Sequence, residues 1–191
     1  MRTFVAIELG AALGARLEVE LRRGSRLAPQ ARWVRPHSLH LTLAFLGEVP
    51  DALAARTGEA LAEVATRHAP HALRLRGSGT FGPLESPKVL WVGVGGALEA
   101  LEALQRALVR ALAPLGLAPD HGVFMPHVTL ARAKGPRGDA ALERCALALQ
   151  GVDFGELPVR EVALFMSQTD REGMRYSPLV THGLSGREPL S

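Results

Sequence analysis

Cysteine is nearly absent from this chain of 191 residues, which contains only Cys145. A single cysteine excludes an internal disulfide and a metal cage built from several thiolates. Cys145 lies in the helical pattern AALERCALALQ, with no histidine close to it in the sequence. We therefore expect a packed or half-exposed cysteine rather than a nucleophile.

Long apolar runs are also missing, and aromatic residues make up only 5% of the chain. No stretch approaches the roughly 20 apolar residues that cross a membrane. The start, MRTFVAIELG, lacks the basic segment and long apolar core of a signal peptide. These absences predict a cytoplasmic protein with no membrane partner. The net charge of +3 tolerates an anionic substrate without requiring nucleic acid.

Strand and helix patterns occur twice in the same order. The first set comprises a strand at 3–9, a helix at 11–23, a strand from residue 40, a helix at 51–68 and a strand at 72–78. The second set comprises a strand from residue 89, a helix at 98–113, a strand from residue 127, a helix at 139–150 and a strand at 159–167. We expect loops or a hairpin in the Gly- and charge-rich segments between and after these sets.

One offset of 87 residues relates the two sets, because it carries Phe4 onto Trp91 and His40 onto His127. This period is too long for a solenoid and indicates an internal duplication. The sequence therefore predicts an α+β fold with pseudo-two-fold symmetry, in which two antiparallel-rich sheets face a central cleft and the helices lie outside. We expect one domain over 1–191, with repeats at about 1–80 and 89–167 and a C-terminal hairpin or tail at 168–191.

Each repeat carries the same short motif on a strand, as His40-Leu41-Thr42-Leu43 and His127-Val128-Thr129-Leu130. Chance gives roughly 0.3 His-x-Thr triplets in a chain of this composition, so two in register are informative. Strand alternation places each histidine and threonine on one face and the apolar residues on the other. The polar faces of both motifs are then expected to meet at the cleft.

These histidines could instead be structural or bind zinc, but the sequence favours neither role. A single His-x-Thr is more often a satisfied core or edge histidine, and a matched pair weakens that interpretation. A zinc site would need further ligands, for which Asp120 and His121 are the nearest candidates. They form no helical i, i+4 pair, and the first repeat has no matching carboxylate, so we predict no metal.

Two facing imidazoles suit phosphoester chemistry, because in-line displacement needs a base beside the entering oxygen and an acid beside the leaving oxygen. Imidazole titrates near neutrality, so one ring can be neutral while the other is protonated. The hydroxyls of Thr42 and Thr129 can hydrogen-bond the non-bridging phosphate oxygens. No protein nucleophile is indicated in these motifs, so water or a substrate hydroxyl is expected to attack.

With both motifs in view, the chain resembles the 2H phosphoesterase superfamily and, within it, the RNA 2′,3′-cyclic phosphodiesterase branch, also called 2′-5′ RNA ligase or LigT-like. The resemblance covers nearly the whole chain and is carried by four segments: TFVAIEL, LHLTLAFLGEV, FMPHVTLAR and ALFMSQTDREGMRYSPL. It implies hydrolysis of a terminal RNA 2′,3′-cyclic phosphate to a 2′-phosphate, without metal or cofactor. In that reaction His40 would be the proton donor and His127 the proton acceptor, and ligation through a 2′-5′ linkage would use them in reverse.

The resemblance also suggests two substrate contacts outside the motifs. Arg132 matches a basic position associated with phosphate, although strict alternation places it opposite His127 and a contact would need a twist or bulge. Phe4 matches an apolar or aromatic position that would touch the nucleobase, and a core role is an equal alternative. Its repeat mate Trp91 is expected in the core.

Several further basic residues could frame the cleft and attract phosphates, although a solvated surface role is the simpler interpretation for each. They are Arg32, Arg35, Arg74, Arg76, Lys134 and Arg137. The partner that all these features imply is RNA with a terminal 2′,3′-cyclic phosphate, or a nucleoside 2′,3′-cyclic phosphate, bound by a monomer.

Two other functions stay open at the level of sequence. An RNA-end binding module could retain the pocket without hydrolysis, although two intact histidines argue against it. Another 2H substrate, such as a cyclic phosphate of an ADP-ribose derivative or a 2′-5′ oligonucleotide, would use the same motifs, because these contact phosphate rather than base.

Overall fold

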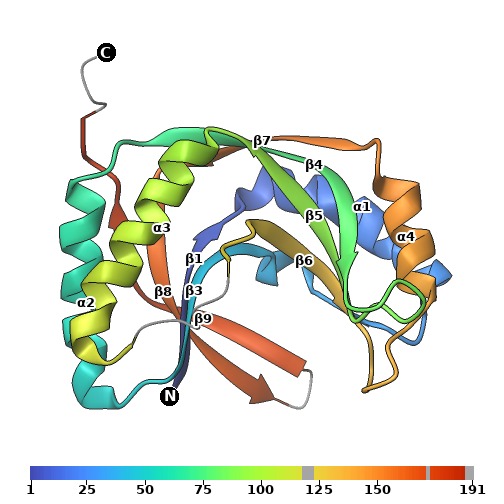
Figure 1. Cartoon of the computed structure of the whole chain (residues 1–191), viewed down its shortest axis with the longest axis horizontal. Helices are drawn as coiled ribbons and strands as arrows, with labels where there is room; N and C mark the ends of the chain where they lie inside the picture. The colour runs from blue at the N-terminus through green and yellow to red at the C-terminus, as the bar shows by residue number, and fades with distance from the viewer. Residues whose placement is uncertain (118–122, 171–172, 188–191) are drawn as a thin grey trace.

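A strongly curled sheet with helices on its outer side forms the protein (Figure 1). The computed structural model describes residues 1–117, 123–170 and 173–187, and within them nine strands and four α-helices are present. The elements are β1 (Arg2–Glu8), α1 (Gly10–Leu27), β2 (Arg32–Trp33), the 3-10 turn η1 (Pro36–Ser38), β3 (His40–Glu48), α2 (Asp51–Thr66), β4 (His71–Phe81), β5 (Val89–Gly96), α3 (Leu98–Leu112), the 3-10 turn η2 (Ala113–Leu115), β6 (His127–Arg132), α4 (Ala141–Leu149), β7 (Asp153–Val159), β8 (Glu161–Asp170) and β9 (Gly173–Gly183).

Each helix buries one apolar stripe against the sheet. In α3 the stripe consists of Leu101, Leu104, Leu108 and Leu112, which are three or four residues apart and fully buried. That spacing places all four side chains on one side of a helix with 3.6 residues per turn. Helices α2 and α3 pack together on one side of the molecule, and α1 and α4 pack together on the other (Figure 1).

The strands pair in the order β7-β4-β5-β6-β3-β1-β8-β9, with β2 added to β6, and the pairings are antiparallel. At the centre, β3 and β6 pair at Leu41 and Val128. Both side chains are completely buried. Within the described residues this one pair joins the two halves of the sheet, so the two predicted sheets form one continuous sheet.

Each half of the sheet takes strands from both sequence repeats. Strand β4 comes from the first repeat but pairs with β5 of the second. Strand β8 comes from the second repeat but pairs with β1 of the first. The arrangement β6-β5-β4-β7 therefore matches β3-β1-β8-β9 by a pseudo-two-fold rotation (Figure 1). This confirms the predicted α+β class and its internal symmetry, and adds an exchange of strands that the repeat pattern did not show.

Matching bulges interrupt the two central strands. On β3, Ala44 pairs with Val5 and Thr42 with Ala6, which leaves Leu43 as an extra residue. On β6, Ala131 pairs with Leu90 and Thr129 with Trp91, which leaves Leu130 extra. An extra residue shifts the strand's alternation by one position. Leu130 and Ala131 are consequently both buried, as are Leu43 and Ala44.

The edge strands β7 and β9 complete the sheet. Pro158 lies in β7 and Pro178 in β9, and both strands are at the ends of the strand order. Proline lacks an amide donor and is tolerated at sheet edges for that reason. The expected hairpin near the C-terminus is confirmed by the pairing of Gln168 with Arg175. None of the described helices combines the length and hydropathy of a membrane span.

Candidate active site

His40 and His127 begin the two strands that meet at the centre of the sheet. Each immediately precedes a member of the joining pair, Leu41 and Val128, so its side chain points to the opposite face of the sheet from the core. Both rings are half-buried. The structure therefore brings together the two motifs, 87 residues apart in the sequence, on one polar face.

Both imidazoles are oriented by the same kind of hydrogen bond. Nδ1 of His40 is 2.7 Å from the carbonyl oxygen of Ser38, and Nδ1 of His127 is 2.7 Å from that of Met125. A carbonyl oxygen only accepts, so Nδ1–H donates in both rings. In its neutral form each ring then carries its lone pair on Nε2, which is free for proton transfer.

Burial lowers the pKa of both histidines below the ordinary value of 6.5, in opposition to the bonds to Ser38 and Met125. The positive charge of Arg132 also lowers the pKa of each ring. His127 adds a smaller lowering to the pKa of His40, as expected for two cationic rings in one cleft. Protonating both rings at once is therefore disfavoured, and near neutral pH the lowered pKa values favour the neutral form of each ring.

Arg132 lies on the same face as His127 because of the β6 bulge. Its side chain is exposed, and its charge acts on His40, His127 and Tyr176. Strict alternation is wrong at this position, since Leu130 and Ala131 both turn into the core. The bulge that a phosphate contact would need is thus present.

The motif threonines occupy the same face one step further along each strand. Thr42 and Thr129 are half-buried. Neither hydroxyl has a hydrogen-bond partner in the part of the chain that the structure describes. Both are therefore available to a bound anion.

Aromatic rings enclose His40. Phe4 lies 4.7 Å from it between ring centroids, and Tyr176 of β9 meets it edge-on at 5.0 Å. Phe165 of β8 stacks on Phe4 at 5.3 Å. Phe4 is only 3% exposed, which supports the core alternative and makes it a packing support for the His40 ring.

A separate aromatic pair encloses His127. Phe81 at the end of β4 meets it edge-on at 4.8 Å and is in turn 5.4 Å from Trp91. The indole of Trp91 lies over Gly79, where an added Cβ would be 2.4 Å from the ring. Trp91 therefore packs behind Phe81, but it is only half-buried and lies outside the hydrophobic core, so the core role expected from the sequence is not borne out.

Three aromatic members of the site, Tyr176, Phe81 and Phe45, do not emerge from the sequence patterns. Phe45 could have been found, because the offset of 87 residues that relates the motifs also carries it onto Arg132. Tyr176 is the only tyrosine of the chain, but strand order alone brings it beside His40. Phe81 lies in a segment for which the sequence predicts a loop, and its position depends on the exchange of β4.

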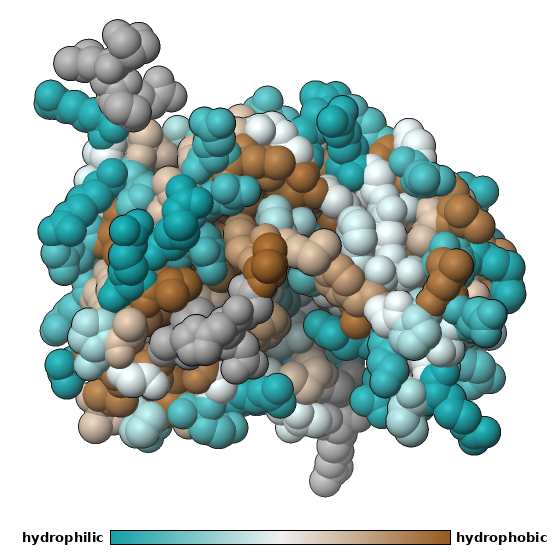
Figure 2. Space-filling view, viewed as in Figure 1, coloured by the Kyte–Doolittle hydropathy of each residue, from teal (hydrophilic) through white to brown (hydrophobic). Residues whose placement is uncertain are grey.

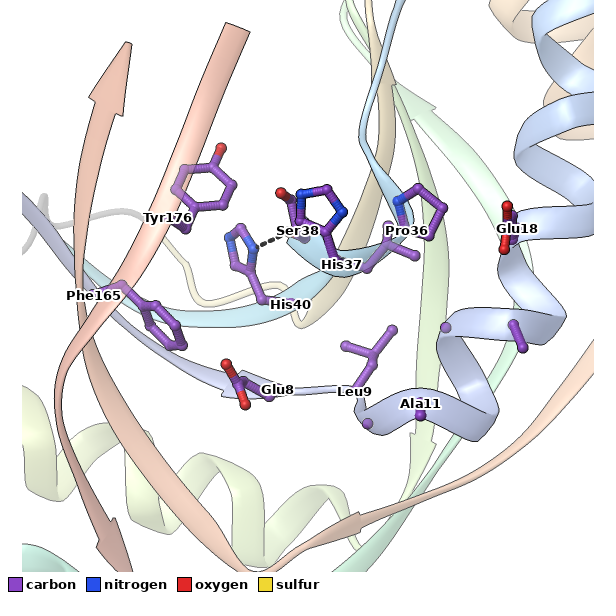
Figure 3. Close-up of a pocket in the computed structure, with 14 residues that line it drawn as sticks. Glu8, Leu9, Ala11, Glu18, Pro36, His37, Ser38, His40, Phe165 and Tyr176 are labelled. Carbon is purple, nitrogen blue, oxygen red and sulfur yellow. Dashed lines mark hydrogen bonds between the residues drawn. The ribbon is translucent and has the colours of Figure 1, made fainter. Parts of the chain in front are cut away.

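Two pockets extend from the cleft in different directions. One, of about 420 Å³, adjoins His40 and is bounded by Tyr176, Phe165 and the start of α1 (Figure 3). In this close-up the rings of His40 and Tyr176 lie beside each other, and the bond from His40 to Ser38 is visible. The other pocket, of about 1000 Å³, runs from His127 along α3 past Phe45 and Phe81. Figure 2 shows the hollow at the centre of one face, with hydrophobic side chains gathered around it.

The remaining basic candidates are dispersed. Arg74 is paired with Asp153 across β4 and β7, with Nε 2.8 Å from Oδ2. Lys134 and Arg137 are exposed in the segment after β6. Arg32 on β2 stands directly opposite Arg132 on β6. Of these four basic residues, Arg32 is therefore the one that pairs with Arg132, whose side chain faces the cleft.

Metal ligands do not cluster in the described part of the chain, where no group of three His, Cys, Asp or Glu side chains comes together. Asp120 and His121, the zinc candidates, lie outside the described residues. Cys145 is 2% exposed in α4, as expected for a packed cysteine.

Comparison with known proteins identifies relatives of this chain in both sequence and structure. A sequence model of the 2′-5′ RNA ligase superfamily matches residues 14–171. An RNA 2′,3′-cyclic phosphodiesterase of Aeropyrum pernix is 38% identical over 156 residues, which cover 81% of this chain and 88% of that protein. Among solved structures, TT0787 of Thermus thermophilus has a TM-score of 0.82 at 30% identity, covering 98% of this chain and 100% of that one.

Escherichia coli LigT, solved in complex with NADP+, has a TM-score of 0.71 at 28% identity, covering 96% of this chain and 98% of its own. The similarity to both solved structures includes the curled sheet and the helices outside it. The sequence match spans most of the chain and both histidine motifs. This chain therefore belongs to the 2′-5′ RNA ligase superfamily.

Proposed function

We propose that this protein hydrolyses terminal RNA 2′,3′-cyclic phosphates to 2′-phosphates, with His40 as the acid and His127 as the base. The observation that carries the proposal is the pair of imidazoles on one face, each with Nδ1–H bound to a carbonyl oxygen and Nε2 left for proton transfer. The relatives named RNA 2′,3′-cyclic phosphodiesterase support this substrate class.

The reaction needs one proton removed and one supplied on opposite sides of phosphorus. Water attacks the phosphorus and gives its proton to Nε2 of His127. The bond from phosphorus to the 3′ oxygen breaks, and that oxygen takes a proton from Nε2 of His40. The product has a 2′-phosphate and a free 3′-hydroxyl, and proton exchange with solvent then restores both rings. Joining a 5′-hydroxyl to the cyclic phosphate would use the same two rings, with that hydroxyl replacing water.

The remaining cleft residues suit a phosphate between the rings. The hydroxyls of Thr42 and Thr129, which have no partners in the described chain, can donate to non-bridging oxygens as negative charge develops. Arg132 faces the same space and supplies a positive charge. The only cysteine, Cys145, is buried in α4, so water is the simplest nucleophile.

We further propose that the protein acts as a cytoplasmic monomer on RNA. Both histidine motifs lie on one chain and face one cleft, so the catalytic pair is complete without a second copy.

The test is to incubate the purified protein, with chelator present, with a nucleoside 2′,3′-cyclic phosphate and with a short RNA that ends in one. We expect a 2′-phosphate product and a loss of about 10²–10⁴-fold in kcat for His40→Ala and for His127→Ala. His68→Ala, just after α2, is the matched histidine control and should retain activity. A 3′-phosphate product would reverse the regiochemistry, and turnover surviving in either cleft variant would overturn the acid–base pair.

A further inference from the structure

Two arginines stand side by side on the cleft face beyond His40. Arg32 of β2 is directly opposite Arg132 of β6 in an antiparallel pair. Directly opposite residues project from the same face, with Cβ atoms about 5 Å apart. The next pair, Trp33 and Ala131, turns the other way, since Ala131 is completely buried and Trp33 packs on Gly24 of α1. Arg32 therefore shares the face of Arg132.

Within the described residues, these two charges have no acidic partner. Both side chains are exposed, and in the described part of the chain neither makes an ion pair. Like charges directly opposite one another in a sheet are destabilising. The unbalanced pair favours a bound anion with charges at more than one position.

The short strand β2 is held firmly in place. The indole Nε1–H of Trp33 donates to the carbonyl oxygen of Ala28 at 3.0 Å, and the amide of Val34 donates to the carbonyl oxygen of Leu130 at 2.8 Å. The indole also lies so close to Gly24 that an added Cβ there would be 2.1 Å from the ring. Arg32 is thus presented from a fixed strand rather than from a free loop.

The two positions that follow the matching bulges differ in charge. The residue related to Arg132 by the repeat is Phe45, which also follows a bulge and is 59% exposed. Because β3 and β6 run antiparallel through Leu41 and Val128, residues after Val128 lie beside those before Leu41. Arg132 and β2 are therefore on the side of His40, and Phe45 is on the side of His127.

We propose that Arg32 and Arg132 form a binding site for the sugar-phosphate backbone of the RNA chain that precedes the cyclic phosphate. This rests on the proposed function, in which His40 protonates the 3′ oxygen and the terminal ribose lies on its side of phosphorus. The chain leaves that ribose through its 5′ oxygen, toward the two arginines. The preferred substrate is then an RNA chain end rather than a single nucleoside cyclic phosphate.

The experiment compares kcat/KM for adenosine 2′,3′-cyclic phosphate and for a tetranucleotide that ends in a 2′,3′-cyclic phosphate. Arg32→Gln should lower the tetranucleotide value about tenfold, as for one lost charge-assisted hydrogen bond, and leave the nucleoside value unchanged. The slope of log kcat/KM against log salt for the tetranucleotide should decrease by about 0.7, as for one lost phosphate contact on a single strand. Arg56→Gln on α2 also removes one exposed charge, and it should leave kcat/KM unchanged for both substrates.

Affinity provides a readout that does not depend on turnover. Anisotropy titration of a labelled tetranucleotide ending in a 2′-phosphate should show weaker binding by Arg32→Gln than by the wild type, with Arg32→Lys in between. Equal losses for both substrates would assign Arg32 to support of the fold and overturn the proposal, as would unchanged tetranucleotide binding. If neither substrate is hydrolysed while binding still depends on Arg32, the proposed function fails and the backbone site stands.

Discussion

Each histidine of the cleft is desolvated by its own aromatic neighbour, which allows the two to be perturbed separately. Tyr176→Ala removes the ring 5.0 Å from His40 and leaves Phe81 beside His127. Burial is the largest cause of the lowered pKa of His40, so this variant should raise that pKa toward 6.5. Phe4 remains 4.7 Å from the ring, so the recovery is partial. The pKa of His127 should stay where it is.

The cost to stability follows from the contacts that are lost. Tyr176 meets His40 and Phe4 edge-on, with centroids 5.0 and 5.1 Å apart. Contacts of this kind contribute about 0.5–1.5 kcal/mol each, so we expect about 1–3 kcal/mol from the two. The folded state also favours neutral His40, a stabilisation present above pH 6.5 and lost as pH falls through the lowered pKa. Tyr176→Ala should therefore lose less stability through His40 on acidification than the wild type does.

The assay is an NMR titration of the imidazole signals, with His40 and His127 assigned from their alanine variants. Phe81→Ala is the converse change and should raise the pKa of His127 alone. In the proposed roles, the alkaline limb of the kcat/KM profile moves upward in Tyr176→Ala and the acid limb moves upward in Phe81→Ala. Local desolvation would be refuted as the cause if either variant shifted the pKa values of both histidines. It would also be refuted if either variant left the pKa of its own neighbouring histidine unchanged.

Four further substitutions probe the proposed phosphate contacts, the central pair and the aromatic packing. Thr42→Val and Thr129→Val should each lower kcat about 10–100-fold with Tm preserved; unchanged kinetics would make both hydroxyls structural. Leu41→Ala leaves a cavity at a completely buried position and should lower the free energy of unfolding, measured with urea, by about 2–5 kcal/mol. A loss under about 1 kcal/mol would show that neighbouring side chains fill the cavity at the central pair. Gly79→Ala forces a Cβ within 2.4 Å of Trp91 and should lower both Tm and kcat by displacing the indole; wild-type values for both would show that the ring moves freely.

The duplicated motif makes the centre of the site predictable. Strand alternation and a shared offset place His40 and His127 on one polar face, and the structure brings them together at the joining pair. The helices and most strands also lie close to their expected ranges, because amphipathic patterns in this chain are regular. These features depend on local periodicity and one repeated spacing, both of which a single sequence contains.

The rest depends on pairing between distant strands. Alternation gives the wrong face for Arg132, since nothing local marks Leu130 as the bulge residue. The sequence pattern does not predict strand β7, because Gly155 and Pro158 interrupt it, and only its position at a sheet edge makes them acceptable. Tyr176 reaches His40 through the pairing of β9 with β8 and of β8 with β1. The spacing of residues along the sequence does not predict such a contact.

Within the described residues, the two halves of the sheet join through one residue pair, Leu41 and Val128. If one half of the sheet twisted against the other with this pair as the pivot, the displacement of a residue would grow with its distance from Leu41 and Val128. His40 and His127 are each one residue from the pivot, so their separation changes least. The edge strands β7 and β9 lie at the two ends of the strand order, farthest along the sheet from this pair. The spacing of the two histidine rings is therefore the dimension of the cleft that such a twist would change least.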